Sequence, residues 1–328
     1  MHTEPFLGRA SMLCFLYGPG EPGRYHAYPM KPLDRSLLSL DGVSLGDSFG
    51  QTFFDAESAA VQRISSQTLP DAPWYITDDS IMASAVHSTL ALHGHIDQSE
   101  LLSQFVRLYE LDRSRGYGAT MARMLRLVVD GSDWREVSGN AFDGMGSFGN
   151  GAAMRVAPVG AYFAGDDQKI VEQARLSAEV THANIEGIAG AIAVAIACGR
   201  AALNSAKRHD SPEVFLAHVA EHTPRSITRD RILQAAELPM SYDVRTAVTV
   251  LGNGVNLSSQ DTVPFSLWCA ARHIDNFTSA MWTTVSGLGD RDTTCAIAGA
   301  VVSLAVGTDN LPSEWLSRRE GLAQWLGH

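Results

Sequence analysis

The stretch DRDTTCAIAGAVVSLAV, residues 290–306, carries the two features that decide how this chain folds. It opens with two carboxylates, Asp290 and Asp292, on either side of Arg291. The remainder, Cys295–Val306, is apolar and rich in small residues, which predicts a closely packed central helix. Carboxylates that lead directly into buried sequence are costly unless a partner neutralises them. The rest of the chain must therefore supply such a partner.

A second acidic cluster, Thr77-Asp78-Asp79-Ser80, opens another apolar helical segment, Ile81–Leu92. A single cluster of this kind is usually an N-cap, whose oxygens accept backbone N–H groups and whose charge suits the positive helix end. Two clusters together supply enough oxygen ligands to hold two hard cations about 4 Å apart. Zinc is disfavoured, because neither cluster contains His or Cys. We predict a two-Mg²⁺ site formed by Thr77, Asp78, Asp79, Asp290, Asp292 and Thr293, with simple helix capping as the alternative.

The amino-acid composition limits the functional classes to which this protein can belong. The net charge of −11 disfavours general nucleic-acid binding and an anionic membrane surface. No uninterrupted apolar run has the roughly 18 residues of a spanning helix. The cysteines Cys14, Cys198, Cys269 and Cys295 show no CxxC spacing, which indicates free thiols in a reducing compartment. We therefore expect a cytoplasmic protein.

Helical periodicity dominates the 328 residues and predicts an all-α fold, a single compact multi-helix orthogonal bundle over residues 34–328. Residues 1–33, broken by several Gly and Pro, are expected to be a loosely ordered extension. One weak strand candidate is Val244–Val250. The predicted helices, besides the two above, are Glu100–Glu110, Ala119–Val129, Gln168–Val180, Ile185–Leu203, Pro212–His222, Ile227–Leu238, Pro264–Arg272 and Asn276–Val285.

A glycine-rich segment, Gly146–Arg155, suggests an anion-binding loop. Its closely spaced glycines, Gly146 and Gly149 among them, let backbone N–H groups converge on a phosphate ahead of a helix start. Ser147 and Asn150 would add side-chain hydrogen bonds, and Phe148 is placed to stack on a base. The segment matches neither a Walker loop nor a Rossmann fingerprint, and an ordinary tight turn remains the alternative.

Two weaker candidates complete the set. Gly116-Tyr117-Gly118 offers a second contact for phosphate or ribose. His182 precedes the Ala-rich helix predicted from Ile185, where a histidine is more often structural than catalytic. Its functional interpretation depends on whether the glycine-rich segment lies nearby.

Six stretches of this sequence resemble the ADP-ribosylglycohydrolase family, in the family's order. The combination of TDD, GNGAAMR and GDRDTT is specific to that family. The matching stretches are GVSLGDSFGQ (42–51), YITDDSIM (75–82), RGYGATM (115–121), GSFGNGAAMRVAPVG (146–160), THANIEGIAGA (181–191) and GLGDRDTTCAIAGA (287–300).

The resemblance implies an all-α fold with a binuclear magnesium, sometimes manganese, site in a cleft, held by the six residues predicted above. It implies hydrolysis of the bond that links ADP-ribose to a protein side chain, with ADP-ribose as product. One carboxylate, Asp79 or Asp292, would accept the proton of the attacking water. The residues that match the family's ligand-binding loops are Gly116, Tyr117, Gly118, Gly146, Ser147, Phe148, Gly149, Asn150 and His182.

One departure from the family pattern bears on the linkage. Serine-type members carry a metal-linked glutamate shortly after the GDxxG turn, and that position is Phe54 here, with Asp55 and Glu57 out of register. We therefore expect an arginine linkage. The alternatives are a catalytically weak ADP-ribose-binding module, another linkage (serine, small molecule or nucleic acid), and a purely structural relative.

Overall fold

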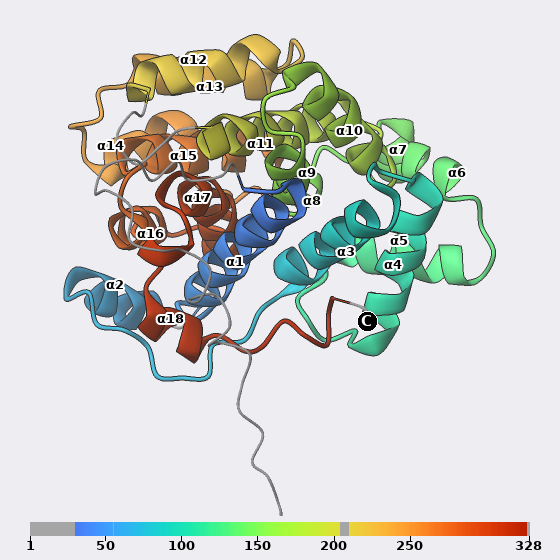
Figure 1. The fold of residues 1–328 in the computed structure, drawn as a ribbon, viewed down its shortest axis with the longest axis horizontal. Helices are drawn as coiled ribbons and strands as arrows, with labels where there is room; N and C mark the ends of the chain where they lie inside the picture. The colour runs from blue at the N-terminus through green and yellow to red at the C-terminus, as the bar shows by residue number, and fades with distance from the viewer. Residues whose placement is uncertain (1–29, 55, 204–209, 327–328) are drawn as a thin grey trace, which may run out of the picture. The chain divides into compact units, whose positions relative to one another are not determined.

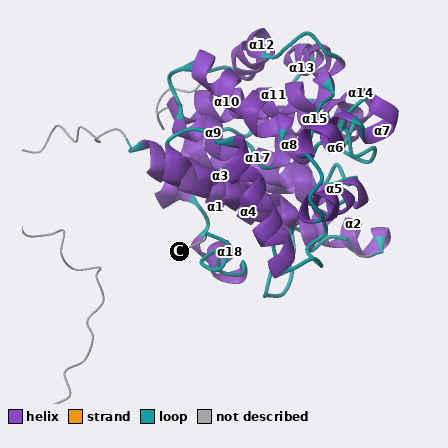
Figure 2. Cartoon of the chain, turned by 90° about the vertical axis from the view of Figure 1, so that its right-hand side faces the viewer, coloured by secondary structure: helices purple, strands orange, loops and turns teal. Residues whose placement is uncertain are grey.

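The computed structural model describes residues 30–54, 56–203 and 210–326, and these residues form helices and loops (Figures 1 and 2). The first helices are α1 (Pro32–Gln51), α2 (Glu57–Ser65), α3 (Asp78–His93), α4 (Gln98–Leu111), α5 (Ala119–Val129), α6 (Trp134–Gly139), α7 (Ala141–Gly144), α8 (Gly151–Met154) and α9 (Ala157–Tyr162). The later ones are α10 (Asp167–Glu179), α11 (Ile185–Leu203), α12 (Pro212–His222), α13 (Ile227–Glu237), α14 (Val244–Leu251), α15 (Ser259–Arg272), α16 (Phe277–Val285), α17 (Arg291–Val306), the 3₁₀ helix η1 (Thr308–Asn310) and α18 (Ser313–Arg318).

The predicted all-α class is confirmed, since the described residues contain only isolated bridges and no strand. The strand candidate Val244–Val250 was wrong, because this segment is helix α14. Asp243 caps the helix by accepting the backbone N–H of Thr246 at 2.9 Å. Ala247 and Leu251, four residues apart, are buried on one face, which is the period of a helix and not of a strand.

Helices α1 and α17 lie in backbone contact at the centre of the fold (Figure 1). Gly42, Gly46 and Gly50 repeat every four residues and so share one face of α1. A Cβ added at Gly46 would lie 2.0 Å from the carbonyl oxygen of Cys295, and one at Gly50 would lie 2.2 Å from that of Arg291. The glycines therefore hold the two helices closer together than any side chain would allow.

Gly46→Ala should destabilise the protein by about 2–3 kcal/mol, because the new methyl group overlaps the α17 backbone, which cannot move aside as a side chain would. The intrinsic helix preference of Ala, about 1 kcal/mol over Gly, is too small to offset this clash. Urea unfolding measures the change. Gly139→Ala is the control, because no atom lies within 4 Å of a Cβ at that position, and it should change stability by less than about 0.5 kcal/mol.

One described helix, α11, has the length and hydropathy of a membrane span, contrary to the expectation that no such segment exists. Its 18-residue window has mean hydropathy 1.6, but 78% of it is buried inside the protein, as in a core helix. The predicted limits of this helix, Ile185–Leu203, are confirmed.

The predicted free thiols Cys198, Cys269 and Cys295 are confirmed as buried and unpaired. Cys14 and most of the expected extension, residues 1–33, lie outside the described residues. Helix α1 begins at Pro32, and the domain boundary at residue 34 stays a prediction.

Candidate metal centre

Three helices bring their carboxylates to one place. The α3 start carries Asp78 and Asp79 directly after its N-cap, Thr77. Asp290 is the N-cap of α17, and Asp292 lies in its first turn. Helix α1 contributes Asp47 from its buried middle. We call the five aspartates, together with Thr77 and Thr293, the acidic centre.

The two acidic clusters meet, although more than two hundred residues separate them in sequence. Carboxylate oxygens of Asp47, Asp79 and Asp292 all lie within 4.8 Å of one another. The hydroxyl of Thr293 donates to Asp79 Oδ2 at 3.4 Å, which joins the start of α17 to the start of α3. The two predicted acidic clusters therefore meet at one place.

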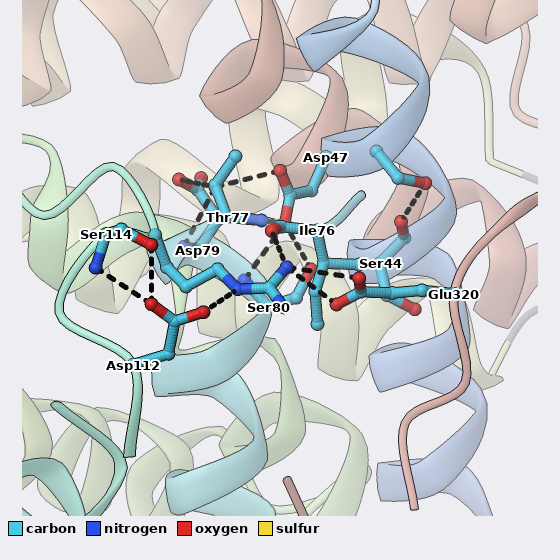
Figure 3. A network of polar contacts seen from close by, with 11 residues as sticks. Ser44, Asp47, Ile76, Thr77, Asp79, Ser80, Asp112, Ser114 and Glu320 are labelled. Atoms are coloured by element: carbon cyan, nitrogen blue, oxygen red, sulfur yellow. Dashed lines mark hydrogen bonds and ion pairs between the residues drawn. The ribbon is translucent and has the colours of Figure 1, made fainter. Parts of the chain in front are cut away.

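Asp47 is a member of this centre that the sequence analysis did not predict. Its side chain is fully buried and accepts hydrogen bonds from the backbone N–H of Thr77 at 2.9 Å and of Ser80 at 3.2 Å. The hydroxyls of Thr77 and Ser80 donate to it as well, as Figure 3 shows. Both of its oxygens are thus engaged, and Asp47 fastens the start of α3 to α1. The sequence does carry one signal for Asp47: it is a charged residue inside a segment that is otherwise buried and has regularly spaced glycines.

Burial raises the pKa values of the aspartates in the acidic centre, and repulsion from Asp292 raises those of the other four further. Burial raises the pKa of Asp47 to about 7, and the nearby Asp292 carboxylate adds to the rise. Burial and Asp292 likewise raise the pKa of Asp290 to about 8. The pKa values of Asp78, Asp79 and Asp292 are raised too, chiefly by burial. Without a bound cation, this concentration of negative charge opposes folding.

The residues present fit a hard divalent cation. Every side chain of the centre offers oxygen, the donor that Mg²⁺ and Mn²⁺ prefer. Asp79 Oδ1 is buried and has no hydrogen-bond partner. None of the ion pairs among the described residues involves the five aspartates. A bound cation is the cheapest neutralisation of this site. The predicted ligands that would hold it are Thr77, Asp78, Asp79, Asp290, Asp292 and Thr293.

Stability of the metal-free protein should fall as pH rises from about 5 to 8. The raised pKa values of Asp47 and Asp290 mean that the folded state binds more protons than the unfolded chain between about pH 4 and pH 8. Their contribution is fully present below pH 4 and is lost as pH rises through 7 and 8. In EDTA, the thermal midpoint should drop by at least about 5 °C over this range. Saturating Mg²⁺ should restore it at pH 8; a flat or rising profile in EDTA would contradict the charge assignment.

The glycine loop, residues 146–151, is fixed beside the acidic centre. The side-chain amide of Asn150 donates to Asp290 Oδ2 at 2.7 Å and to the hydroxyl of Thr262 at 3.0 Å. The Ser259 N–H donates to the carbonyl of Phe148 at 3.0 Å. Asn150 therefore orients a carboxylate of the centre and ties the loop to it, a role that the sequence analysis did not anticipate.

The remaining parts of the loop lie close by. A Cβ at Gly149 would be 3.3 Å from the Ser147 hydroxyl, and the ring of Phe148 lies 5.1 Å from that of Phe142. Gly146 has φ +71°, the left-handed conformation that favours glycine. The Phe pair is a surface on which a planar ring can stack.

His182 lies against the glycine loop, the condition on which its functional interpretation depended. A Cβ at Gly151 would be 3.3 Å from His182 Cε1. The ring is buried, and its Nδ1 is 2.6 Å from the Thr181 hydroxyl. Burial and the neighbouring Arg155 lower the pKa of His182 to about 3. His182 is therefore neutral and acts through packing and hydrogen bonding.

The Gly116-Tyr117-Gly118 segment flanks the start of α3. The carbonyl of Arg115 accepts the Asp78 N–H at 2.7 Å, and a Cβ at Gly116 would be 3.3 Å from Asp78 Oδ1. The hydroxyl of Tyr117 is buried without a partner, and burial together with Asp78 raises its pKa. An unpartnered donor at this position suits a hydroxyl or phosphate of a ligand. Gly118 has no atom within 4 Å of an added Cβ.

The carboxyl-terminal segment supports this side of the centre. Arg115 bridges Asp112 at 2.8 Å and Glu320 at 2.9 Å, and also donates to the Ile76 carbonyl. The Glu320 N–H donates to the carbonyl of Trp74 at 2.9 Å. Residues near the end of the described chain thus hold the segment that leads into α3.

Comparison with known proteins places this site in context. The family model described as ADP-ribosylglycohydrolase matches residues 29–327. ADP-ribosylhydrolase ARH3 of Homo sapiens is 28% identical over 332 residues, which cover 89% of this chain and 90% of that protein. ADP-ribosyl-[dinitrogen reductase] glycohydrolase of Rhodospirillum rubrum is 26% identical, covering 87% of this chain and 90% of its own length.

A solved structure shares the arrangement of helices. It is described as an ADP-ribosylglycohydrolase-related protein complex and superposes with a TM-score of 0.65. The match covers 90% of this chain and 95% of the other at 21% sequence identity, and it therefore bears on the fold alone.

Proposed function

The chain belongs to the ADP-ribosylglycohydrolase family, and on this premise we propose that it hydrolyses the glycosidic bond between ADP-ribose and a protein side chain, with Mg²⁺ at the acidic centre. The observation that carries the proposal is the convergence of Asp47, Asp79 and Asp292 within 4.8 Å. Helix capping alone would not need the two clusters to meet.

Three buried free thiols are consistent with a reducing compartment, and we propose that the protein is cytoplasmic.

The bound cations and the carboxylates of the acidic centre would have different roles in the reaction. Bound divalent cations would neutralise the carboxylates and supply Lewis acidity toward ribose hydroxyls and water. Asp79 and Asp292 present carboxylates that can accept the proton of an attacking water. As water adds to the anomeric carbon, the bond to the side chain breaks and the departing group takes up that proton.

Other residues position the substrate. The N–H groups of Gly146, Gly149 and Asn150 already donate within the protein. The remaining backbone N–H groups of the glycine loop would bind the diphosphate, next to the side-chain amide that holds Asp290. The unpartnered hydroxyl of Tyr117 can donate to the ligand beside Asp78. Phe148, with Phe142 beside it, provides a stacking surface for adenine.

We assign the linkage to arginine. Phe54 stands where serine-type members of the family carry a glutamate, and it is 47% exposed, with the Arg291 guanidinium 5.1 Å from its ring centre. The residue at this position therefore supplies no carboxyl group. An ADP-ribosylated arginine is cationic at its guanidinium, and the surrounding carboxylates attract such a group.

The test is release of free ADP-ribose from two substrates, one ADP-ribosylated on arginine and one on serine, with and without Mg²⁺. The proposal expects Mg²⁺-dependent release from arginine, at least about tenfold faster than from serine. Release from serine alone would overturn the arginine assignment and leave the hydrolase. ADP-ribose binding in calorimetry without release from either substrate would replace the enzyme with a binding module.

A further inference from the structure

A second group of metal-ligand side chains lies on other helices, α10 and α12 (Figure 1). It consists of Asp167, the first residue of α10, and of His218 and His222 on α12. The two histidines are four residues apart and so lie on one helix face, with ring centres 4.5 Å apart. Neither helix carries any residue of the acidic centre.

The distances from Asp167 to the two histidines match those in a coordination shell. His218 Nε2 is 3.3 Å and His222 Nε2 is 3.6 Å from the same oxygen, Asp167 Oδ2. In a tetrahedral zinc site with bonds of about 2.0–2.2 Å, neighbouring ligand atoms are about 3.3–3.6 Å apart. All three ligand atoms lie within 4.8 Å of one another.

A hydrogen bond fixes the tautomer of His222 in the form that can bind a metal through Nε2. His222 Nδ1 lies 2.9 Å from the backbone carbonyl of His218. A carbonyl only accepts, so Nδ1 carries the proton, and in the neutral ring Nε2 presents a lone pair. Nε2 faces the Asp167 carboxylate, so a proton or a metal cation between the two atoms stabilises the contact. A backbone carbonyl that fixes the tautomer of a ligating histidine is a common feature of zinc sites.

The other histidine makes no hydrogen bond through its Nε2 atom. His218 Nε2 is buried and makes no hydrogen bond of acceptable geometry, despite its proximity to Asp167. The nearby Arg200 is paired with Asp210, at 2.6 Å.

We propose that Asp167, His218 and His222 form a second metal site, selective for zinc or a similar imidazole-binding transition metal. Two imidazoles and one carboxylate suit Zn²⁺, whereas Mg²⁺ prefers oxygen ligands. Three protein ligands leave one coordination position for water. The metal links the start of α10 to the last turns of α12, a helix that otherwise packs chiefly against α11, α13 and α15.

Calorimetry of the full chain with Zn²⁺, under saturating Mg²⁺ to occupy the acidic centre, tests the proposal. One Zn²⁺ per chain should bind, and His222→Ala and Asp167→Asn should each weaken binding at least about tenfold. His95→Ala is the matched control, an exposed histidine outside the group whose change should leave Zn²⁺ affinity unaltered. Unchanged Zn²⁺ affinity in folded Asp167→Asn and His222→Ala would overturn the site.

Anomalous scattering from crystals soaked in Zn²⁺ supplies a test that needs no variant. A peak between Asp167 Oδ2 and the two Nε2 atoms supports the site. Zn²⁺ density only at the acidic centre would overturn it. Because the two sites share no residue, failure of the second site in either test leaves the hydrolase proposal unaffected.

Discussion

Asp292→Asn should reduce ADP-ribosyl hydrolysis by about 10³-fold or more and, in the same variant, raise the thermal midpoint of the metal-free protein. Asp292 is a repulsive neighbour of Asp47, Asp78, Asp79 and Asp290, whose pKa values it raises. Its removal relieves charge repulsion in the metal-free state but deletes a predicted cation ligand and a candidate proton acceptor. Losses of this size are typical when a charged group that stabilises a transition state is removed.

The opposite signs of the two effects separate a functional role from a structural one. If Asp292 only accepted the Thr293 N–H in the first turn of α17, Asn would replace it at little cost in either measurement, because the Asn side-chain oxygen also accepts such bonds. Asp243→Asn is the matched control, since Asp243 caps α14 away from the centre. The control should keep both activity and thermal midpoint. An Asp292→Asn protein with full activity would contradict the role assigned to this carboxylate.

Asp47→Ala should destabilise the protein by about 3 kcal/mol or more and weaken Mg²⁺ binding. The substitution removes the acceptor of four hydrogen bonds from Thr77 and Ser80, two of them from backbone N–H groups. Unsatisfied buried donors cost about 1–3 kcal/mol each, more than the relief of repulsion returns when Mg²⁺ is present. Urea unfolding in Mg²⁺ measures the loss, and calorimetry measures the affinity.

Two further variants show whether the loss of stability in Asp47→Ala comes from the buried hydrogen bonds. Asp47→Asn keeps one side-chain acceptor and should fall between Ala and the original residue. Asp41→Ala, on the same helix, removes only a partly exposed pair with Arg319 at 3.0 Å and should cost about 1 kcal/mol or less. Equal losses for Asp47→Ala and Asp41→Ala would show that the buried network does not anchor α3.

The fold was predictable where apolar spacing was regular. The predicted limits of α5, α11 and α12 are those of the structure. Helix α1 was not predicted, because the glycines that join it to α17 are poor helix formers, and only the partner helix explains them. The strand prediction at Val244–Val250 was wrong for a local reason. The β-branched residues of this segment favour a strand, but the Asp243 cap and the spacing of Ala247 and Leu251 favour a helix.

The acidic centre was predictable in its residues but not in its supports. Clustered Asp and Thr residues before apolar helices were visible in the sequence. Two hydrogen bonds that support the centre join segments far apart in the chain. They link Asn150 to Asp290 and Ser80 to Asp47. No local pattern encodes such pairings. Likewise, Asp167 has no sequence relation to His218 and His222, and only the packing of α10 near α12 brings them together.

The glycine contact between α1 and α17 has a consequence for the choice of ion. Gly50 lies so close to α17 that an added Cβ would be 2.8 Å from the Asp292 Cα, so main-chain atoms set how far apart the walls of the centre stand. Main-chain spacing does not stretch to accommodate a wider occupant. A cavity of fixed calibre discriminates by ionic radius, and Ca²⁺, whose bonds to oxygen are about 0.3–0.5 Å longer than those of Mg²⁺, should be a poor substitute and an ineffective activator.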